Sequence, residues 1–387
     1  MPFLPTARIR IQPFFGYRNR ERLTLTVRAL RSRVHAFEKT SSWRAFHRMI
    51  AQFASHEVPG LVVTLELVSP SGERSLHQAQ TDDEGYARFD IALDGGWPYA
   101  ARPEWETVTL TWHDGRGPGS IDGHVLVPGE RSALGVISDI DDTIIETGIT
   151  GNVRAMLRNW RRVLLEMPAE RLAVPGADVL YSALGGGAAD ETAPHHAGAH
   201  QQASRRPFFY VSSSPWNLYS YLVAYMQLRG LPLGPIMLRD WGLNRATFGS
   251  ASHGAHKVEA IAAILDTYRE MRFALLGDDS QGDLTAFAAL AAAHPGRIRA
   301  IFVRKVGETM TAAEDAAQAA IAAAGISLWL GTGYDRMQDF LAAIGLDDDE
   351  DAQSIAATVE APAAVSGDAR DPASEAQLSV PVQRQPG

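Results

Sequence analysis

Three carboxylates follow directly on a short apolar segment near the middle of the chain. Leu134–Ile137 is apolar, and the side chains that come after it include Asp139, Asp141, Asp142 and Thr143. In an extended chain residues i and i+2 point the same way, so Asp139 and Asp141 face one site. Two carboxylates this close are costly unless a cation neutralises them or one is protonated. A divalent metal, an ionised carboxylate as nucleophile and a neighbour that carries a proton support covalent catalysis. The structural alternative is that these residues cap a helix or form a turn.

Hydroxyl groups follow a second apolar segment. Phe208–Val211 is apolar and leads into three serines. The Ser212 hydroxyl can donate to a phosphoryl oxygen, and a helix that begins near Trp216 adds backbone N–H groups for an anion. The alternative is that Ser212–Ser214 only cap that helix.

A lysine and a second acidic cluster complete the set. Lys257 stands at the start of a predicted helix, where its charge opposes the helix dipole, which indicates another purpose such as binding a phosphate. Phe273–Leu276 is apolar and leads into Gly277 and the acids Asp278, Asp279 and Asp283. Hard oxygen ligands in this number suit Mg²⁺, with water in the remaining octahedral positions.

Four predicted strands alternate with four predicted helices. The predicted strands are Leu134–Ile137, Phe208–Val211, Phe273–Leu276 and Ile298–Val303, and the predicted helices are Asn152–Glu166, Asn217–Gly230, Lys257–Met271 and Leu284–Ala293. Alternation of this kind predicts an α/β fold with a parallel, Rossmann-like sheet and flanking helices. Open α/β sheets place their sites at the carboxyl ends of the strands, so the polar residues above should meet at one edge.

The first third of the chain has a different texture. Short segments with period two or β-rich composition are separated by turn signals, and they predict strands at Arg8–Ile11, Leu23–Val27, Leu61–Leu67, Leu76–Gln80, Ala87–Leu93 and Thr107–Trp112. Phe37–Phe53 has helical spacing. We therefore expect a small all-β, sandwich-like domain over residues 1–130, an α/β domain over 131–345 and a tail over 346–387.

Composition excludes several classes of protein. The chain has 387 residues and no cysteine, which excludes disulfides, thiolate metal sites and a cysteine nucleophile. Its net charge of −9 argues against a nucleic-acid partner recognised through bulk charge. No apolar run approaches the length of a transmembrane helix, and the first residues lack the core of a secretory signal. Localisation in the cytoplasm is the resulting expectation.

The net charge hides an asymmetry. Residues 1–50 carry a net charge of +9, whereas residues 346–387 carry −7. The acidic segment has few large apolar residues, so we expect it to be disordered. The basic segment fits an anionic surface such as phospholipid headgroups, but a solvated strand face with scattered arginines is the favoured interpretation.

Taken in order, the four polar segments resemble the motifs of the haloacid dehalogenase superfamily, D-x-D-x-T, strand-Ser, Lys and G-D-x-x-x-x-D. The surrounding residues resemble more narrowly the actin-patch-type phosphatidate phosphatases and their bacterial relatives. The segments that carry this resemblance are Ser138–Ile144, Tyr210–Tyr219, Met237–Asp240 and Leu276–Asp283. It covers about residues 120–345, and before them only Phe15–Tyr17 and Thr81–Tyr86 are similar.

The resemblance implies a role for each matching residue. Asp139 would attack phosphorus and form an aspartyl-phosphate, and Asp141 would protonate the leaving alkoxide and then deprotonate the attacking water. Mg²⁺ would be held by Asp139, the Asp141 backbone carbonyl, and Asp278 or Asp283. Ser212 and Lys257 would bind the phosphoryl oxygens, with Thr143 orienting the loop beside them. For Asp142, Asp279 and His256 a structural role is favoured over a catalytic one.

The sequence leaves more than one class of substrate open. The resemblance implies Mg²⁺-dependent hydrolysis of phosphatidate to diacylglycerol and phosphate, with peripheral contact to a membrane. The arginine-rich face of Asn152–Glu166 fits a headgroup interface and equally a helix packed on the sheet. Gly185–Arg206, with three histidines, is interpreted as an exposed insertion rather than a metal site. The alternatives are a phosphatase for a soluble phosphoester, a phosphotransferase, or a binding protein that acts through its N-terminal domain.

Overall fold

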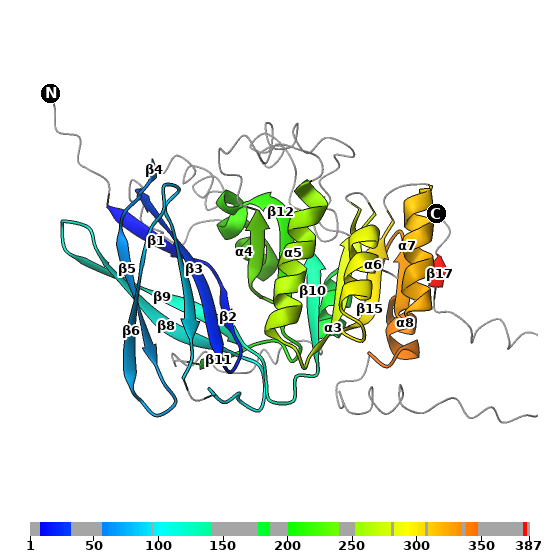
Figure 1. Cartoon of the computed structure of the whole chain (residues 1–387), viewed down its shortest axis with the longest axis horizontal. Helices are drawn as coiled ribbons and strands as arrows, with labels where there is room; N and C mark the ends of the chain where they lie inside the picture. Colours follow the sequence, from blue (N-terminus) through cyan, green and yellow to red (C-terminus); the bar gives the residue numbers. More distant parts are fainter. Residues whose placement is uncertain are drawn as a thin grey trace, which may run out of the picture.

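The computed structural model of the chain describes residues 8–31, 56–94, 96–140, 177–185, 200–239, 252–279, 282–305, 309–334, 337–346 and 382–384. Within these ranges the strands form two sheets, one of ten strands and one of seven. Figure 1 shows the first sheet on one side of the molecule and the second, with its helices, on the other. We call residues 8–127, together with the strand β11, the β module, and the rest of the described chain from Leu134 the α/β module.

The β module is built from strands with alternating buried and exposed residues. Its strands are β1 (Ile9–Pro13), β2 (Gly16–Arg18), β3 (Arg22–Arg31), β4 (His56–Glu57), β5 (Val62–Val68), β6 (Arg74–Gln80), β7 (Tyr86–Ala92), β8 (Glu104–His113) and β9 (Pro118–Val127). They are hydrogen-bonded in the order β1-β3-β2-β9-β8-β5-β6, with β4 and β7 also on β3. Leu25, Leu65, Phe89 and Leu110 meet in one core, so this single sheet folds back on itself. An all-β unit is thus present, but as one continuous sheet rather than two separately bonded sheets.

The second sheet is parallel and fully buried at its centre. Its strands are β10 (Leu134–Asp139), β12 (Phe208–Pro215), β13 (Ile236–Arg239), β14 (Arg272–Asp278), β15 (Ile298–Arg304), β16 (Ser327–Gly331) and β17 (Val382–Arg384). Their order is β13-β12-β10-β14-β15-β16-β17. Every residue of β10 is buried, which explains why a central strand reads as an apolar run.

Helices cover both faces of the parallel sheet. One layer contains α3 (Ala177–Gly185), α4 (Tyr219–Leu228) and α8 (Met337–Ala343), and the other contains α5 (Ser252–Thr267), α6 (Asp283–Ala293) and α7 (Ala312–Ala323). Successive strand residues serve opposite layers, because Val136 packs with the first and Ile137 with the second. This three-layer arrangement confirms the predicted α/β class with flanking helices.

Most predicted strands are present, with boundaries shifted by a few residues. The sequence patterns missed β9, whose Pro118, Gly119 and Gly123 look like turn residues although β9 pairs with β8 along its whole length. They also missed β2, β13, β16, α3, α7 and α8. The predicted helices Phe37–Phe53 and Asn152–Glu166 lie outside the described residues.

Two segments depart from the expected domain division. Within the expected insertion, β11 (His200–Gln202) pairs antiparallel with β8 and so extends the sheet of the β module. Within the expected disordered tail, β17 pairs in parallel with β16. Neither short strand has an apolar pattern of its own. Each was therefore missed in the sequence and is defined only by its pairing with a neighbouring strand. The rest of both segments lies largely outside the described residues.

No helix in the described part of the chain is long and apolar enough to cross a membrane.

Candidate functional site at the carboxyl edge of the parallel sheet

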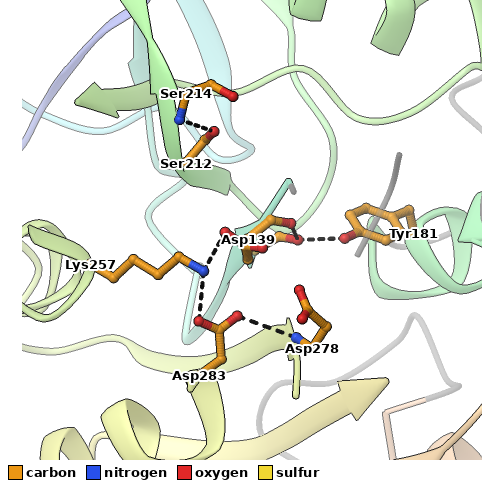
Figure 2. Close-up of polar contacts among 8 residues, drawn as sticks. Asp139, Tyr181, Ser212, Ser214, Lys257, Asp278 and Asp283 are labelled. Atoms are coloured by element: carbon orange, nitrogen blue, oxygen red, sulfur yellow. Dashed lines mark hydrogen bonds and ion pairs between the residues drawn. The ribbon is translucent and has the colours of Figure 1, made fainter. Parts of the chain in front are cut away.

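Three buried carboxylates meet where the central strands end. Asp139 is the last residue of β10, Asp278 is the last residue of β14, and Asp283 is the first residue of α6. Their exposed fractions are 4%, 0% and 0%. One carboxylate oxygen from each lies within 4.8 Å of the other two (Figure 2). The prediction that adjacent parallel strands bring these acids together is confirmed.

Lys257 binds two of the three carboxylates. Its Nζ lies 2.9 Å from Oδ1 of Asp139 and 2.6 Å from Oδ1 of Asp283, and the side chain is buried. Burial alone would lower the pKa of Lys257, but the charges of Asp139 and Asp283 raise it by more. The net result is a pKa above the ordinary lysine value, so the ammonium group stays charged.

The position of Lys257 in its helix differs from the prediction. The helix α5 begins at Ser252, five residues before Lys257. The helix dipole acts mainly within the first turn, so the argument that Lys257 opposes the dipole at a helix start was wrong. The ion pairs with Asp139 and Asp283 account for the buried lysine instead.

Two glycines shape the approach of Asp283. The backbone N–H of Asp278 donates to Oδ2 of Asp283 at 3.2 Å. A Cβ at Gly277 would collide with the Asp283 carboxylate, so only glycine leaves room for it. Gly282 precedes α6 with a φ of 80°, which glycine adopts without strain. The G-D-x-x-x-x-D spacing therefore has a steric basis as well as a chemical one.

Ser212 lies at the carboxyl end of the neighbouring strand. Asp139 pairs in register with Val211, so Ser212 is one residue further along β12. Ser212 is fully buried, and its Oγ accepts a hydrogen bond of 3.0 Å from the Ser214 backbone N–H (Figure 2). The alternative that these serines cap the following helix is wrong for α4, whose N-cap position is Leu218 and has no side-chain cap.

A buried tyrosine supports Asp139 from the opposite layer. Ser138 Oγ donates to the Asp139 backbone oxygen at 2.7 Å, and the Tyr181 hydroxyl of α3 hydrogen-bonds the same Oγ. Burial, above all, raises the pKa of Tyr181 well above its usual value, so the hydroxyl stays protonated. A single tyrosine in a helical segment carries no sequence signal for this role.

Arg304 is a second cation beside the acids. It ends β15, it is 8% exposed, and it pairs in register with Asp278. In-register residues of parallel strands project from the same face of the sheet, so the two side chains lie on one side. The buried Tyr334 lies close enough to feel these charges. Burial, above all, raises the pKa of Tyr334, the charge of Arg304 lowers it, and the charges of Asp278 and Asp139 raise it. Arg304 follows the apolar run Ile298–Val303, so the strand-end signal used for Asp139 could have found it.

The remaining predicted residues are Asp141, Asp142, Thr143, Asp279 and His256. Asp141, Asp142 and Thr143 lie outside the described residues. The Asp279 backbone N–H donates to the Arg304 carbonyl at 3.0 Å, which is a structural contact. His256 is half-buried on α5, next to Lys257.

Among the described residues, the acids at this edge outnumber the cations. Asp139, Asp278 and Asp283 carry three negative charges, whereas Lys257 and Arg304 carry two positive ones. Buried charges are costly unless they are paired, so the surplus negative charge favours a bound cation or a bound proton. Among the described residues this is the group of acids with metal-ligand geometry.

Fold and site define an α/β protein with an acidic centre at the carboxyl edge of its parallel sheet. Residues 134–305 of this chain match the family described as phosphatidate phosphatase APP1, catalytic domain. That segment runs from the start of β10 to just past β15 and contains every residue of the cluster except Tyr334. The resemblance to actin-patch-type phosphatidate phosphatases is thereby confirmed for this segment.

Individual relatives match over the same part of the chain. Phosphatidate phosphatase APP1 of Saccharomyces cerevisiae is 32% identical over 178 residues, which cover 46% of this chain and 27% of the yeast protein. An uncharacterized protein of Schizosaccharomyces pombe is 25% identical over 179 residues, covering 46% of this chain and 26% of that protein. The matched region thus spans about a quarter of each relative.

Similarity to solved structures is weak. A β-glucuronidase of Parabacteroides merdae aligns with 84% of this chain and 39% of its own, at 8% identity and a TM-score of 0.25. A score this low supports no inference about fold or function.

Proposed function

We propose that this protein is a Mg²⁺-dependent phosphatidate phosphatase that releases diacylglycerol and phosphate through an aspartyl-phosphate intermediate. The observation that carries the proposal is the convergence of Asp139, Asp278, Asp283 and Lys257 within 134–305, the segment that matches the phosphatidate phosphatase family. Three hard oxygen ligands and a surplus negative charge are what a small divalent cation requires.

The acids of the cluster fit such a cation. Asp139, Asp278 and Asp283 would hold it, and the resemblance adds the Asp141 backbone carbonyl. When bound, Mg²⁺ supplies charge neutralisation at the phosphoryl group during transfer.

The chain's own residues account for both chemical steps. A carboxylate oxygen of Asp139 forms a bond to phosphorus while the bond to the diacylglycerol oxygen breaks, and Asp141 donates its proton to that oxygen. In the second step Asp141 takes a proton from water, whose oxygen attacks phosphorus and releases Asp139. Lys257 and Ser212 bind the phosphoryl oxygens, and Lys257 also holds Oδ1 of Asp139 in place. Tyr181 and Ser138 fix the backbone from which Asp139 projects.

Phosphate release from dispersed phosphatidate tests the proposal. Wild-type protein with Mg²⁺ should release phosphate, and EDTA or the Asp139→Asn substitution should abolish the release. Soluble phosphomonoesters in parallel samples separate the substrate classes. Release from phosphatidate that survives both EDTA and Asp139→Asn would contradict the mechanism.

A soluble phosphoester is the second candidate substrate, and the β module favours it. Arg18, Arg22 and Arg28 of the basic N-terminal segment pair with Glu106, Asp90 and Glu57 of the same module. Their charge is therefore engaged within the module rather than presented to an anionic membrane. Release from soluble esters alone would retain the aspartyl-phosphate mechanism and exclude phosphatidate as substrate.

The proposal includes a haloacid dehalogenase-like catalytic domain over 131–345, an N-terminal all-β domain over 1–130, and a cytoplasmic location with peripheral membrane contact. The parallel strand order, the acids at the strand ends and the separate ten-stranded sheet support the two domains.

A further inference from the structure

The β module presents two consecutive aromatic residues to the α/β module. Phe14 and Phe15 lie between β1 and β2, which run one after the other along β3. Pro13 pairs with Val27 and Tyr17 pairs with Thr24, so this strand has one residue more than its partner between the two pairs. An extra residue of this kind is a β-bulge, which redirects side chains.

The bulge explains why two neighbouring rings reach the same target. In a regular strand Phe14 and Phe15 would point to opposite faces. Here the ring centroids of both lie near Tyr219, at 4.6 Å for Phe14 and 5.9 Å for Phe15. A Cβ at Gly16 would lie 2.6 Å from the Thr24 backbone oxygen, so the residue after the two rings must be small.

The rings contact the segment that directly follows Ser212. Phe14 lies 4.3 Å from the ring of Trp216, and Tyr86 of the β module lies 6.0 Å from the same ring. The backbone N–H of Phe15 donates to the Tyr219 hydroxyl oxygen at 2.7 Å. Burial raises the pKa of Tyr219, so this hydroxyl remains uncharged. Trp216 and Tyr219 are four and seven residues beyond Ser212, at the start of the 3-10 helix Trp216–Leu218 and at the start of α4.

A second contact holds β12 on the other side of Ser212. Tyr17 lies 6.0 Å from Phe209, which precedes Ser212 by three residues on the same strand. Two hydrogen bonds also join the modules. The Tyr268 hydroxyl donates to the Arg18 carbonyl at 3.2 Å, and Asn19 Nδ2 donates to the Thr267 carbonyl at 2.9 Å. The N-terminal strand therefore contacts β12 before Ser212 and the helical segment that follows β12 after it.

We propose that Phe14 and Phe15 are positioning residues for the phosphate-binding end of β12, so that the β module forms part of the active-site framework. The inference rests on the proposed function only in assigning phosphate binding to Ser212. Without the aromatic contacts, Trp216 and the Ser212–Pro215 end of β12 would lose packing on one side. The geometry of Ser212 would then be set only by its neighbours in the parallel sheet.

The first test compares Phe14→Leu with Phe89→Leu as its matched control. Phe89 is a buried ring in the core of the β module. Its substitution therefore lowers stability but keeps the contacts of Phe14 with Trp216 and Tyr219. Phe14→Leu should weaken inhibition by inorganic phosphate and raise KM about three- to ten-fold, the size of one or two aromatic contacts. Phe89→Leu should leave both unchanged while lowering Tm.

A cycle with Ser212→Ala separates positioning from general loosening of the site. If Phe14 acts through Ser212, Phe14→Leu should have little further effect on phosphate inhibition in the Ser212→Ala protein. Additive effects of the two substitutions would overturn the proposal.

Hydrogen exchange provides a readout that needs no activity. Amides of residues 208–219 should exchange faster in Phe14→Leu than in wild-type or Phe89→Leu protein. Tyr219→Phe, which keeps the ring and loses the acceptor for the Phe15 N–H, should show a smaller increase and serves if Phe14→Leu does not fold. Unchanged exchange in both would overturn the proposal. A wild-type protein that neither hydrolyses phosphoesters nor binds phosphate, yet shows the exchange difference, would overturn the proposed function and leave the structural support intact.

Discussion

The two modules handle charge in opposite ways. In the β module three arginines each pair with one acid: Arg18 with Glu106, Arg22 with Asp90, and Arg28 with Glu57. At the carboxyl edge of the parallel sheet, Asp139 and Asp283 share Lys257, and Asp278 lies beside them with Arg304 on the neighbouring strand.

This difference distinguishes a structural use of charge from a functional one. A buried charge with its own partner is satisfied and requires nothing further. Carboxylates that outnumber their cations in a buried site are stable only when another cation or a proton joins them. Arg18, which is 2% exposed and pairs with Glu106, is the first kind. Asp139, Asp278 and Asp283 are the second kind.

The largest effect is expected at the nucleophile. Asp139→Asn should lower phosphate release by at least about 10³-fold, because a neutral carboxamide cannot attack phosphorus. Its Tm should not fall, since the substitution removes one of three like charges and Lys257 keeps Asp283. The control is Asp90→Asn in the β module, which should keep wild-type activity. Comparable losses in the two variants would remove the distinction between the modules.

Breaking a buried pair in the β module should cost stability but not chemistry. Arg18 donates from Nε to Glu106 Oε2 at 2.7 Å, and its side chain is 2% exposed. Arg18→Met should lower the free energy of unfolding by about 3 kcal/mol, because it leaves a partly buried carboxylate without its cation. Urea unfolding measures this loss, and calorimetry on the folded variant should show unchanged Mg²⁺ affinity. A changed affinity would mean that the pair serves the site as well.

Gly277→Ala should weaken the acidic site without touching the β module. The added Cβ would push the Asp283 carboxylate away, so we expect Mg²⁺ binding to weaken about ten-fold, as for other residues that orient metal ligands. Titration calorimetry with Mg²⁺ on the otherwise wild-type chain measures it, with Asp278→Asn as the reference for lost binding. Gly185→Ala, at the end of α3, is the control. Equal Mg²⁺ affinity in Gly277→Ala and wild type would show that Asp283 does not ligate the ion.

The smallest effect is expected at an exposed pair. Arg22 and Asp90 form an ion pair with side chains 63% and 50% exposed, where solvent screens the attraction. Arg22→Ala should leave Tm and phosphate release indistinguishable from wild type. A drop in Tm as large as that of Arg18→Met would show that burial does not decide the value of pairs in this module.

The strand-end pattern predicted where several of the described polar residues meet. Asp139, Ser212, Lys257, Asp278 and Asp283 were expected at one edge, because carboxyl ends of adjacent parallel strands must meet there. Asp141 and Thr143 remain predictions, since they lie outside the described residues. The helix start before Lys257 was misplaced, because Ser252–His256 contains small and polar residues without an apolar stripe. The strands β2 and β9 were missed, because their Gly and Pro residues look like turn residues, whereas the stability of both strands comes from pairing.

The sequence by itself determined which chemistry is available. Acids, a lysine and a serine follow apolar strand segments, and the sequence records them because strand periodicity and hydrophobic burial are local properties. Only the tertiary structure decided which residues support that chemistry. Tyr181 reaches Ser138, and Phe14 reaches Trp216 across some two hundred residues. Such contacts depend on how strands pair and modules pack, and no local pattern in the chain encodes them.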